Sequence, residues 1–320
     1  MILDTLLFVL GLLLLYFGAE GLVQGASSVA LQYGIRPVVV GLTVVALGTS
    51  MPEFLVNVFA VLTDAAPLAL GTIIGSNISN VALILGTCAL VMPLTVTPEI
   101  LRREYPVMLG VMVLFYLCAL DGVIGAVDGL LMVGLLLGLG GYLIYDTHRA
   151  DTAAMIEQIE AELTGADPDM SALAKTTHLA GGMIGLAVGA HLMVDSAIDM
   201  AHLLGVPTGI IGLTAVAFGT SLPELAASLV SAAKGDSDLS VGNVMGSNVL
   251  NVLFVVGVIS VIEPLEVSAR ALRIDFPVML GVCGLLLPLT LNEPRISRVG
   301  GSVLLLLFLG YITFLLSPYL

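Results

Sequence analysis

Long apolar runs, separated by short charged or Gly/Pro-rich segments, occupy most of the chain. A helix needs roughly 20 mostly apolar residues to cross a bilayer, and the runs are close to that length. The short alternating pattern of membrane barrel strands is absent. The chain is therefore predicted to be an all-α membrane protein, with ten transmembrane helices at residues 2–24, 37–62, 67–92, 105–121, 124–146, 177–200, 208–233, 238–262, 274–291 and 299–318.

Composition agrees with this prediction. Of the 320 residues, 58% are hydrophobic and 11% are charged, whereas a soluble domain has about 45–50% and about 25%. The apolar composition makes the lipid bilayer the expected partner, and the net charge of −14 argues against nucleic acid. Cys88, Cys118 and Cys283 lie in apolar runs without metal-ligand spacing, and we expect inert thiols and no cofactor. Nothing in the sequence indicates an oligomeric state.

Residues 147–175 form the only long polar segment. It contains several acidic residues, but they lack the D-x-D-x-D-G spacing of an EF-hand. We therefore expect an acidic linker between two domains of five spans each, residues 1–146 and 176–320.

The two halves are copies of one unit. Shifted by 171 residues, GLTVVALGTSMPE (41–53) aligns with GLTAVAFGTSLPE (212–224), and GTIIGSNISNV (71–81) aligns with GNVMGSNVLNV (242–252). Of the 46 positions that contain both motifs, 18 are identical without a gap, which identifies a tandem duplication. Because each copy has five spans, the second enters the membrane in the opposite sense, as in the inverted repeats of many secondary transporters.

The basic residues test this inversion. Cytoplasmic loops of membrane proteins are enriched in Lys and Arg. With ten spans, eight basic residues fall on the side opposite the N-terminus and two on the N-terminal side. We expect a multi-pass protein of the inner (cytoplasmic) membrane with both termini outside and residues 147–175 in the cytosol. The eight are Arg36, Arg102, Arg103, Arg149, Lys175, Lys234, Arg295 and Arg298, and the two are Arg270 and Arg273.

The second span has an unusual centre, Gly48-Thr49-Ser50-Met51-Pro52-Glu53. Its proline removes a backbone N–H and clashes with the preceding turn, so we expect a kink or an unwound turn that frees carbonyls, including that of Ala46. A carboxylate near the bilayer centre costs a few kcal/mol, which makes Glu53 a functional candidate. Close helix packing would explain an isolated Gly/Pro motif, but this motif recurs in the seventh span. The equivalent residues there are Ala217, Gly219, Thr220, Ser221, Pro223 and Glu224.

The third and eighth spans add polar side chains. Gly75-Ser76-Asn77-Ile78-Ser79-Asn80 is matched by Gly246-Ser247-Asn248-Val249-Leu250-Asn251, and the Ser and the last Asn of each motif share a helix face. We expect broken helices 2, 3, 7 and 8 to form the core, with Asn77 and Asn248 capping breaks. Oxygen ligands would then converge from Glu53, Glu224, Asn80, Asn251, Thr49, Thr220, Ser76 and Ser247 and from backbone carbonyls.

An all-oxygen site without His or Cys suits Ca²⁺, which takes 6–8 oxygens, and Na⁺, which is similarly hard. Two carboxylates are neutralised by one Ca²⁺, by two Na⁺ or by two protons. An empty, doubly negative site is costly at low dielectric, which blocks the return step unless something is bound. Competition of two ions for such a site predicts exchange.

These motifs resemble a known family. GTSMPE and GTSLPE, followed by GSNISN and GSNVLN, are similar to the two α-repeats of the calcium/cation antiporter superfamily, in its sodium/calcium exchanger branch. The resemblance covers both halves and implies alternating access with exchange of Na⁺ for Ca²⁺ near the midplane. It also implies Glu53 and Glu224 as principal ligands. The site would be completed by Thr49, Ser50, Ser76, Thr220, Ser221 and Ser247 and by the carbonyls of Ala46 and Ala217.

One position departs from part of that family. Some members carry Asp where this chain has Asn251, opposite Asn80, which removes a titratable group and weakens the case for potassium co-transport. The alternative function is H⁺/Ca²⁺ exchange on the same scaffold, since buried carboxylates can carry protons. Outside the antiporters, the alternatives are a cation channel, which needs no counter-ion, and an intramembrane protease, which needs a catalytic pair within the spans.

Overall fold

The computed structural model describes residues 2–33, 35–62, 66–149, 170–203, 219, 221–291 and 293–317. The first half contains α1 (Ile2–Tyr33), α2 (Pro37–Val40), the π-helical η1 (Gly41–Val45), α3 (Ala46–Leu62), α4 (Ala66–Ser79), the π-helical η2 (Asn80–Leu85), α5 (Gly86–Val91), β1 (Leu94–Thr95), α6 (Pro98–Arg102), α7 (Glu104–Ala119), β2 (Val123–Ile124) and α8 (Ala126–Arg149). The second half contains α10 (Ala172–Leu203), α12 (Leu222–Ala233), α13 (Ser237–Leu250), the π-helical η3 (Asn251–Val256), α14 (Gly257–Ile262), β3 (Leu265–Glu266), the π-helical η4 (Ala271–Asp275), α15 (Phe276–Thr290), β4 (Arg295–Ile296) and α16 (Arg298–Leu316).

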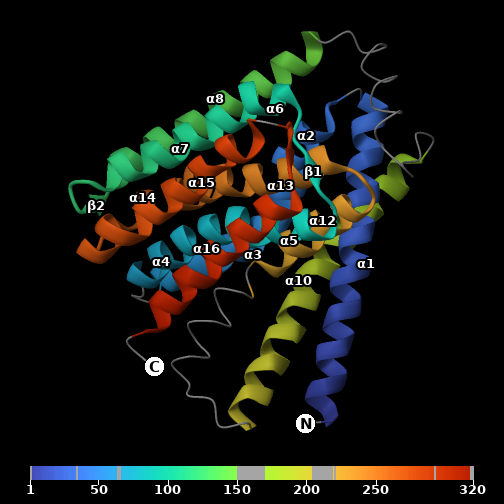
Figure 1. The fold of residues 1–320 in the computed structure, drawn as a ribbon, viewed down its shortest axis with the longest axis horizontal. Coiled ribbons are helices and arrows are strands. Elements are labelled where there is room, and N and C mark those ends of the chain that lie inside the picture. Colours follow the sequence, from blue (N-terminus) through green and yellow to red (C-terminus); the bar gives the residue numbers. More distant parts are fainter. Residues whose placement is uncertain are drawn as a thin grey trace.

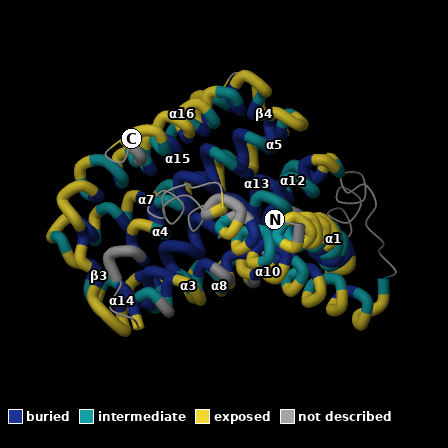
Figure 2. The backbone as a smooth tube through the Cα atoms, turned by 90° about the horizontal axis from the view of Figure 1, so that it is seen from below, coloured by how far each residue is buried: buried dark blue, intermediate teal, exposed yellow. Residues whose placement is uncertain are grey.

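Membrane-spanning helices dominate this structure. Within the described residues, seven helical stretches are long and apolar enough to cross a membrane, and a bent pair, Val38–Met51 with Glu53–Leu62, is an eighth. Two predicted spans do not appear among these. Helix α7 has only 16 residues, and the span expected at 208–233 is described mainly in its C-terminal part, α12. Exposed residues lie along the outside of the molecule and buried ones at its centre (Figure 2). Much of the outside is apolar, for example Leu130 and Leu306, as lipid contact requires.

The helix ends differ from the prediction. Helix α1 has 32 residues, about 48 Å at 1.5 Å per residue, which exceeds a hydrocarbon core of about 30 Å. Helix α8 continues to Arg149 and α10 begins at Ala172, so both helices extend a few residues into the predicted linker, 147–175. The backbone hydrogen bonds of a helix are internal, and polar residues can therefore extend it beyond the bilayer. Lys175, in the first turn of α10, donates to Gln32 Oε1 of α1 at 2.6 Å. The acidic part of the linker lies outside the described residues.

The elements repeat with the same offset as the sequence. Helix α4, segment η2, helix α5 and strand β1 correspond to α13, η3, α14 and β3 when 171 is added to their residue numbers. Strand β1 pairs antiparallel with β4, and β2 pairs antiparallel with β3, so each pair joins the first half to the second. Figure 1 shows β1 and β2 towards opposite ends of α7.

Of the predicted breaks within the described residues, one is a sharp bend, and the break expected in the seventh span lies partly outside them. The second span bends by 49° between its two parts at Met51 and Glu53, which confirms the expected kink. The alternative of an unwound turn is wrong, because α3 is continuous and follows η1 directly. The predicted breaks in the third and eighth spans are also wrong. Neither has a proline near its Gly-Ser-Asn motif, so the backbone keeps its N–H donors and the helix stays continuous, with the π turns η2 and η3 beginning at Asn80 and Asn251.

Helices α1 and α10 lie side by side and project from the remaining helices (Figure 1). Glycines bring their backbones together. A Cβ atom on Gly18 would meet Leu186 N at 2.7 Å, and one on Gly11 would meet Gly189 O at 2.7 Å. Larger residues at these positions would push the two helices apart.

Candidate cation-binding site

Glu53 and Glu224 meet inside the molecule. Their relative exposures are 2% and 0%, and their carboxyl groups are neighbours that interact directly. Glu53 follows the bend of the second span, whereas Glu224 lies in the first turn of α12, where the helix dipole favours negative charge. Among the described residues, no Lys, Arg or His forms an ion pair with either carboxylate.

The Glu224 carboxylate is held by side chains from the first half. Ser50 donates to Glu224 Oε1 at 3.0 Å and lies 3.1 Å from Ser247 Oγ. The Thr49 side chain also interacts with Glu224. With Glu53, the structure therefore brings together five predicted ligands, from the second, seventh and eighth spans.

The Glu53 side of the site is different. Neither Glu53 oxygen accepts a hydrogen bond from the described residues, and the buried hydroxyls of Ser76 and Ser221 also have no partner there. Under the repeat, Ser221 is equivalent to Ser50 and Ser76 to Ser247. The two halves thus carry the same groups, but Ser50 and Ser247 are bonded to each other, whereas Ser221 and Ser76 have no partner in the described part of the chain.

Four asparagines form a buried network across the two halves. Asn80 Nδ2 donates to Asn248 Oδ1 at 3.0 Å, and the equivalent bond under the repeat runs from Asn251 Nδ2 to Asn77 Oδ1 at 3.4 Å. Asn248 Nδ2 also donates to the Asn77 carbonyl oxygen at 3.3 Å. The predicted capping role of Asn77 and Asn248 is therefore wrong, because both lie within continuous helices and bind the amides of the opposite half. These bonds occupy the nitrogens of Asn80 and Asn251 and leave the two oxygens as free acceptors.

Seven buried oxygens of the predicted ligands have no hydrogen-bond partner among the described residues. A buried polar atom without a hydrogen bond costs about 1–3 kcal/mol, and a bound cation would remove that cost because each of these oxygens is an electron-pair donor. In the described part of the chain, no cluster of three or more His, Cys, Asp or Glu side chains offers another metal site. The seven oxygens are Glu53 Oε1 and Oε2, Glu224 Oε2, Ser76 Oγ, Ser221 Oγ, Asn80 Oδ1 and Asn251 Oδ1.

Three buried polar residues of the site were missed in the sequence. Asn57 donates to the Glu53 carbonyl oxygen at 2.7 Å. Asn243 donates to Ser228 Oγ at 2.9 Å, and its Oδ1 accepts from Thr49 Oγ1 at 3.3 Å. The sequence spacing could have indicated two of them, because Asn57 and Ser228 each lie four residues after a central glutamate and therefore on the same helix face as that glutamate.

The remaining predicted ligands are a carbonyl and two residues outside the described part. The carbonyl oxygen of Ala46, a fully buried residue, accepts from Thr49 Oγ1 at 3.3 Å. Thr220 and Ala217 lie outside the described residues, so their positions stay predictions.

Known proteins resemble this chain over its full length. The family model of the sodium/calcium exchanger protein matches residues 3–145 and 176–317. The putative antiporter CaxA of Alkalimonas amylolytica is 37% identical over 315 residues, which cover 97% of this chain and 98% of the relative. The sodium/calcium exchanger MaX1 of Methanosarcina acetivorans is 30% identical over 343 residues, with 98% of each chain covered.

A solved structure also resembles this chain over nearly its full length. The sodium-calcium exchanger NCX_Mj matches with a TM-score of 0.82 at 31% identity, over 98% of this chain and 99% of that one. The protein is thus a multi-pass membrane transporter and not an enzyme, and it belongs to the sodium/calcium exchanger family of cation antiporters.

Proposed function

We propose that this protein exchanges Na⁺ for Ca²⁺ across the cytoplasmic membrane by alternating access. The observation that carries the proposal is that seven buried oxygens of the predicted ligands, three of them on the two carboxylates, have no hydrogen-bond partner among the described residues. Ca²⁺ takes 6–8 oxygen ligands in flexible geometry, which this set matches in number and type. One Ca²⁺ or two Na⁺ balance the charge of the two carboxylates, so the two cargoes compete for the same oxygens.

Glu53 and Glu224 are the principal ligands in this proposal. Their burial without a basic partner among the described residues supports it, since two adjacent anions require bound positive charge. Asn80 and Asn251 contribute amide oxygens whose orientation is set by the asparagine network. The remaining ligands proposed are Ser76, Ser221, Ser50, Ser247 and Thr49 and the carbonyl of Ala46, with Thr220 and Ala217 added by the repeat.

We further propose ten spans in two inverted five-helix repeats, residues 1–146 and 176–320. The strand pairs support this arrangement. Ten spans place the loops that contain β1 and β4 on one side of the membrane and those of β2 and β3 on the other, and these are the loops that pair. The excess of arginines near β1 and β4 favours the cytosol on that side, with both termini outside.

Proton coupling is the second candidate, with H⁺/Ca²⁺ exchange on the same scaffold. The Glu53 carboxylate favours it, because neither oxygen accepts a hydrogen bond within the described part and a proton on it would remove half of the charge of the pair. The two candidates differ in which gradient drives Ca²⁺ movement.

The deciding experiment is ⁴⁵Ca²⁺ uptake into proteoliposomes. We expect rapid uptake into vesicles loaded with Na⁺, and none into vesicles loaded with K⁺ at equal pH. A pH gradient imposed on K⁺-loaded vesicles should have no effect. Uptake that follows the pH gradient and ignores Na⁺ would overturn sodium coupling. Uptake without either counter-ion would identify a channel.

A further inference from the structure

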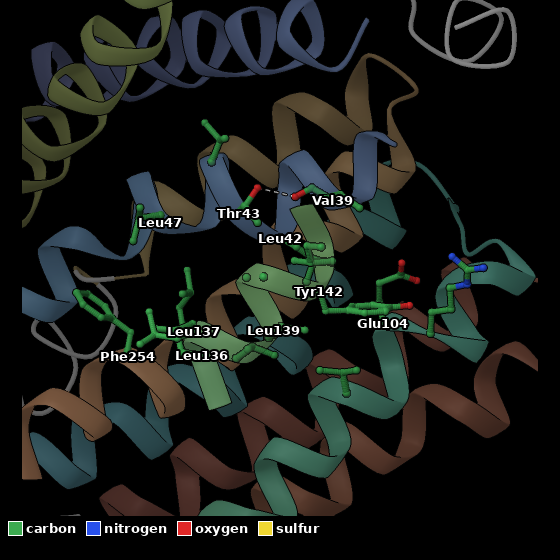
Figure 3. A pocket seen from close by; sticks show the side chains of 18 of the residues that line it. Val39, Leu42, Thr43, Leu47, Glu104, Leu136, Leu137, Leu139, Tyr142 and Phe254 are labelled. Carbon is green, nitrogen blue, oxygen red and sulfur yellow. Dashed lines mark hydrogen bonds between the residues drawn. The ribbon is translucent and has the colours of Figure 1, made fainter. Parts of the chain in front are cut away.

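The Thr49 hydroxyl differs from that of Thr43, in the same span, in where its proton can go. A threonine within a helix usually donates to a carbonyl three or four residues earlier. Thr43 does this with Val39 O at 2.7 Å, as Figure 3 shows. Thr49 has the corresponding contact, to Ala46 O, at 3.3 Å, and a second acceptor at the same distance, Asn243 Oδ1 of α13. Its single proton therefore has one acceptor inside the helix and one in the other half of the chain.

Cation binding would leave Asn243 as the acceptor of that proton. The Thr49 side chain also interacts with the Glu224 carboxylate, so its hydroxyl has three acceptor groups among the described residues. Two of them, the Ala46 carbonyl and the Glu224 carboxylate, are proposed ligands, and so is the Thr49 oxygen itself. A hydroxyl has one proton and two lone pairs, and it presents a lone pair to a cation when its proton points elsewhere. Of the three acceptors, Asn243 Oδ1 is the one that is not a proposed ligand.

The nitrogen of the Asn243 amide fixes the orientation of its oxygen. Nδ2 donates to Ser228 Oγ at 2.9 Å and to the Glu224 backbone carbonyl oxygen at 3.4 Å. A carbonyl oxygen can only accept, so the amide nitrogen must face it and the amide oxygen is directed at Thr49. These four residues have relative exposures of 1% or less. An apolar pocket of about 590 Å³ lies beside the same span, but neither Thr49 nor Asn243 lines it, so water there does not replace these partners.

The first half carries the same two groups on exchanged helices. Under the repeat, Ser228 of α12 is equivalent to Asn57 of α3, and Asn243 of α13 is equivalent to Thr72 of α4. Each half therefore has one amide and one hydroxyl at this pair of positions. Asn57 Nδ2 donates to the Glu53 backbone carbonyl oxygen at 2.7 Å, and Asn243 contacts the equivalent carbonyl of its own half. Two amides at non-equivalent positions that contact equivalent carbonyls indicate a requirement of the site rather than a by-product of the duplication.

We propose that Asn243 is a positioning residue of the cation site. It accepts the proton of the Thr49 hydroxyl when a cation binds, so that the Thr49 oxygen and the Ala46 carbonyl both face the ion. Asn57 supports the backbone of the central glutamate in the first half, as Asn243 does in the second. The proposal rests on the exchange function above, because it treats Thr49 and the Ala46 carbonyl as ligands. Loss of the Asn243 amide should therefore weaken cation binding through the Thr49 hydroxyl.

The test is equilibrium binding of ⁴⁵Ca²⁺ to the full-length protein, purified in detergent. Asn243→Thr places the first-half residue in α13 and should weaken Ca²⁺ binding roughly tenfold, about the value of one or two neutral hydrogen bonds. Adding Ser228→Asn supplies the amide from α12, as Asn57 supplies it from α3, and should restore most of the affinity. The matched control is Ser231→Ala, which should bind Ca²⁺ as the wild type does. Its hydroxyl is also buried in α12 but donates within that helix, to Ala227 O at 2.9 Å.

A double-mutant cycle tests whether Asn243 acts through the Thr49 hydroxyl. Thr49→Val should weaken Ca²⁺ binding, and Asn243→Thr should then add little, because the proton that Asn243 positions is already gone. A purely structural role of Asn243 predicts losses that add. Thr43→Val is the control for Thr49→Val and should leave binding unchanged, since the Thr43 hydroxyl donates within its own helix.

Three results would overturn the positioning role. They are wild-type affinity in Asn243→Thr, additive losses in the cycle with Thr49→Val, and a folded Asn243→Thr/Ser228→Asn variant that regains no affinity. Binding is measured without a gradient or a counter-ion, so the outcome does not depend on sodium coupling. Wild-type protein that binds Ca²⁺ but does not exchange it for Na⁺ would overturn the exchange function alone, whereas wild-type protein that binds no Ca²⁺ would overturn both.

Discussion

The asparagine network makes a quantitative prediction about Asn77, which is not itself a proposed ligand. In Asn77→Ala, the Asn251 amide loses the acceptor that lies 3.4 Å from its nitrogen. A neutral hydrogen bond contributes about 0.5–1.5 kcal/mol, and a buried donor left without a partner costs about 1–3 kcal/mol. The amide is then free to rotate its oxygen away from the cation. We expect a loss of about 1–3 kcal/mol in Ca²⁺ binding, or roughly 5- to 150-fold in affinity.

The assay is the Ca²⁺ concentration at half-maximal exchange, measured in Na⁺-loaded proteoliposomes. Asn248→Ala should lower the Ca²⁺ affinity at least as much, because its Oδ1 accepts the shorter bond, 3.0 Å from Asn80. Thr290→Ala is the control. That residue is also buried, but its hydroxyl donates within its own helix, to Leu286 O. Wild-type Ca²⁺ affinity in correctly folded Asn77→Ala and Asn248→Ala would show that the network does not orient the ligands.

Three further changes test the site and the helix packing. Replacing either central carboxylate by glutamine should abolish ⁴⁵Ca²⁺ exchange, whereas Glu99→Gln on an exposed surface should not; full activity in a central variant would refute the ligand assignment. Asn251→Asp adds a third carboxylate, so protons should compete more strongly with Ca²⁺ and the flux should fall more steeply at acidic pH than in the wild type; identical pH profiles would contradict this. Gly18→Val should lower the thermal midpoint in detergent by several degrees, because overpacking costs about 1–3 kcal/mol, whereas Gly21→Val, with its nearest neighbour at 3.5 Å, should be tolerated.

The parts of this structure that depend on local chemistry could be predicted from the sequence. Apolar runs give the positions of most spans, and Pro52 gives the bend, because a proline acts on its own turn. The central glutamates could be identified because a carboxylate inside an apolar helix has few structural explanations. The ends of α1, α8 and α10 were misjudged, since a helix continues past the bilayer wherever its residues allow it.

The features that depend on contact between the halves could not be predicted. Asn77 lies 171 positions from Asn248, and no local pattern indicates that its side chain meets the other repeat rather than its own backbone. The π turns that begin at Asn80 and Asn251 could not be predicted either, because each lies where one half packs against the other. Asn243 was missed for a related reason, since its equivalent in the first half is Thr72 and the duplication does not mark it.

The crossed strand pairs have a consequence for how such a protein can be assembled. Strand β1 has its partner in the second half and β3 has its partner in the first, and the two glutamates are likewise divided between the halves. Either half made as a separate polypeptide would lack both the edge partner of its strands and one carboxylate. Two such polypeptides inserted in opposite orientations could regain both by pairing. The proposed ten-span arrangement makes the single chain equivalent to an antiparallel heterodimer whose two subunits are covalently joined.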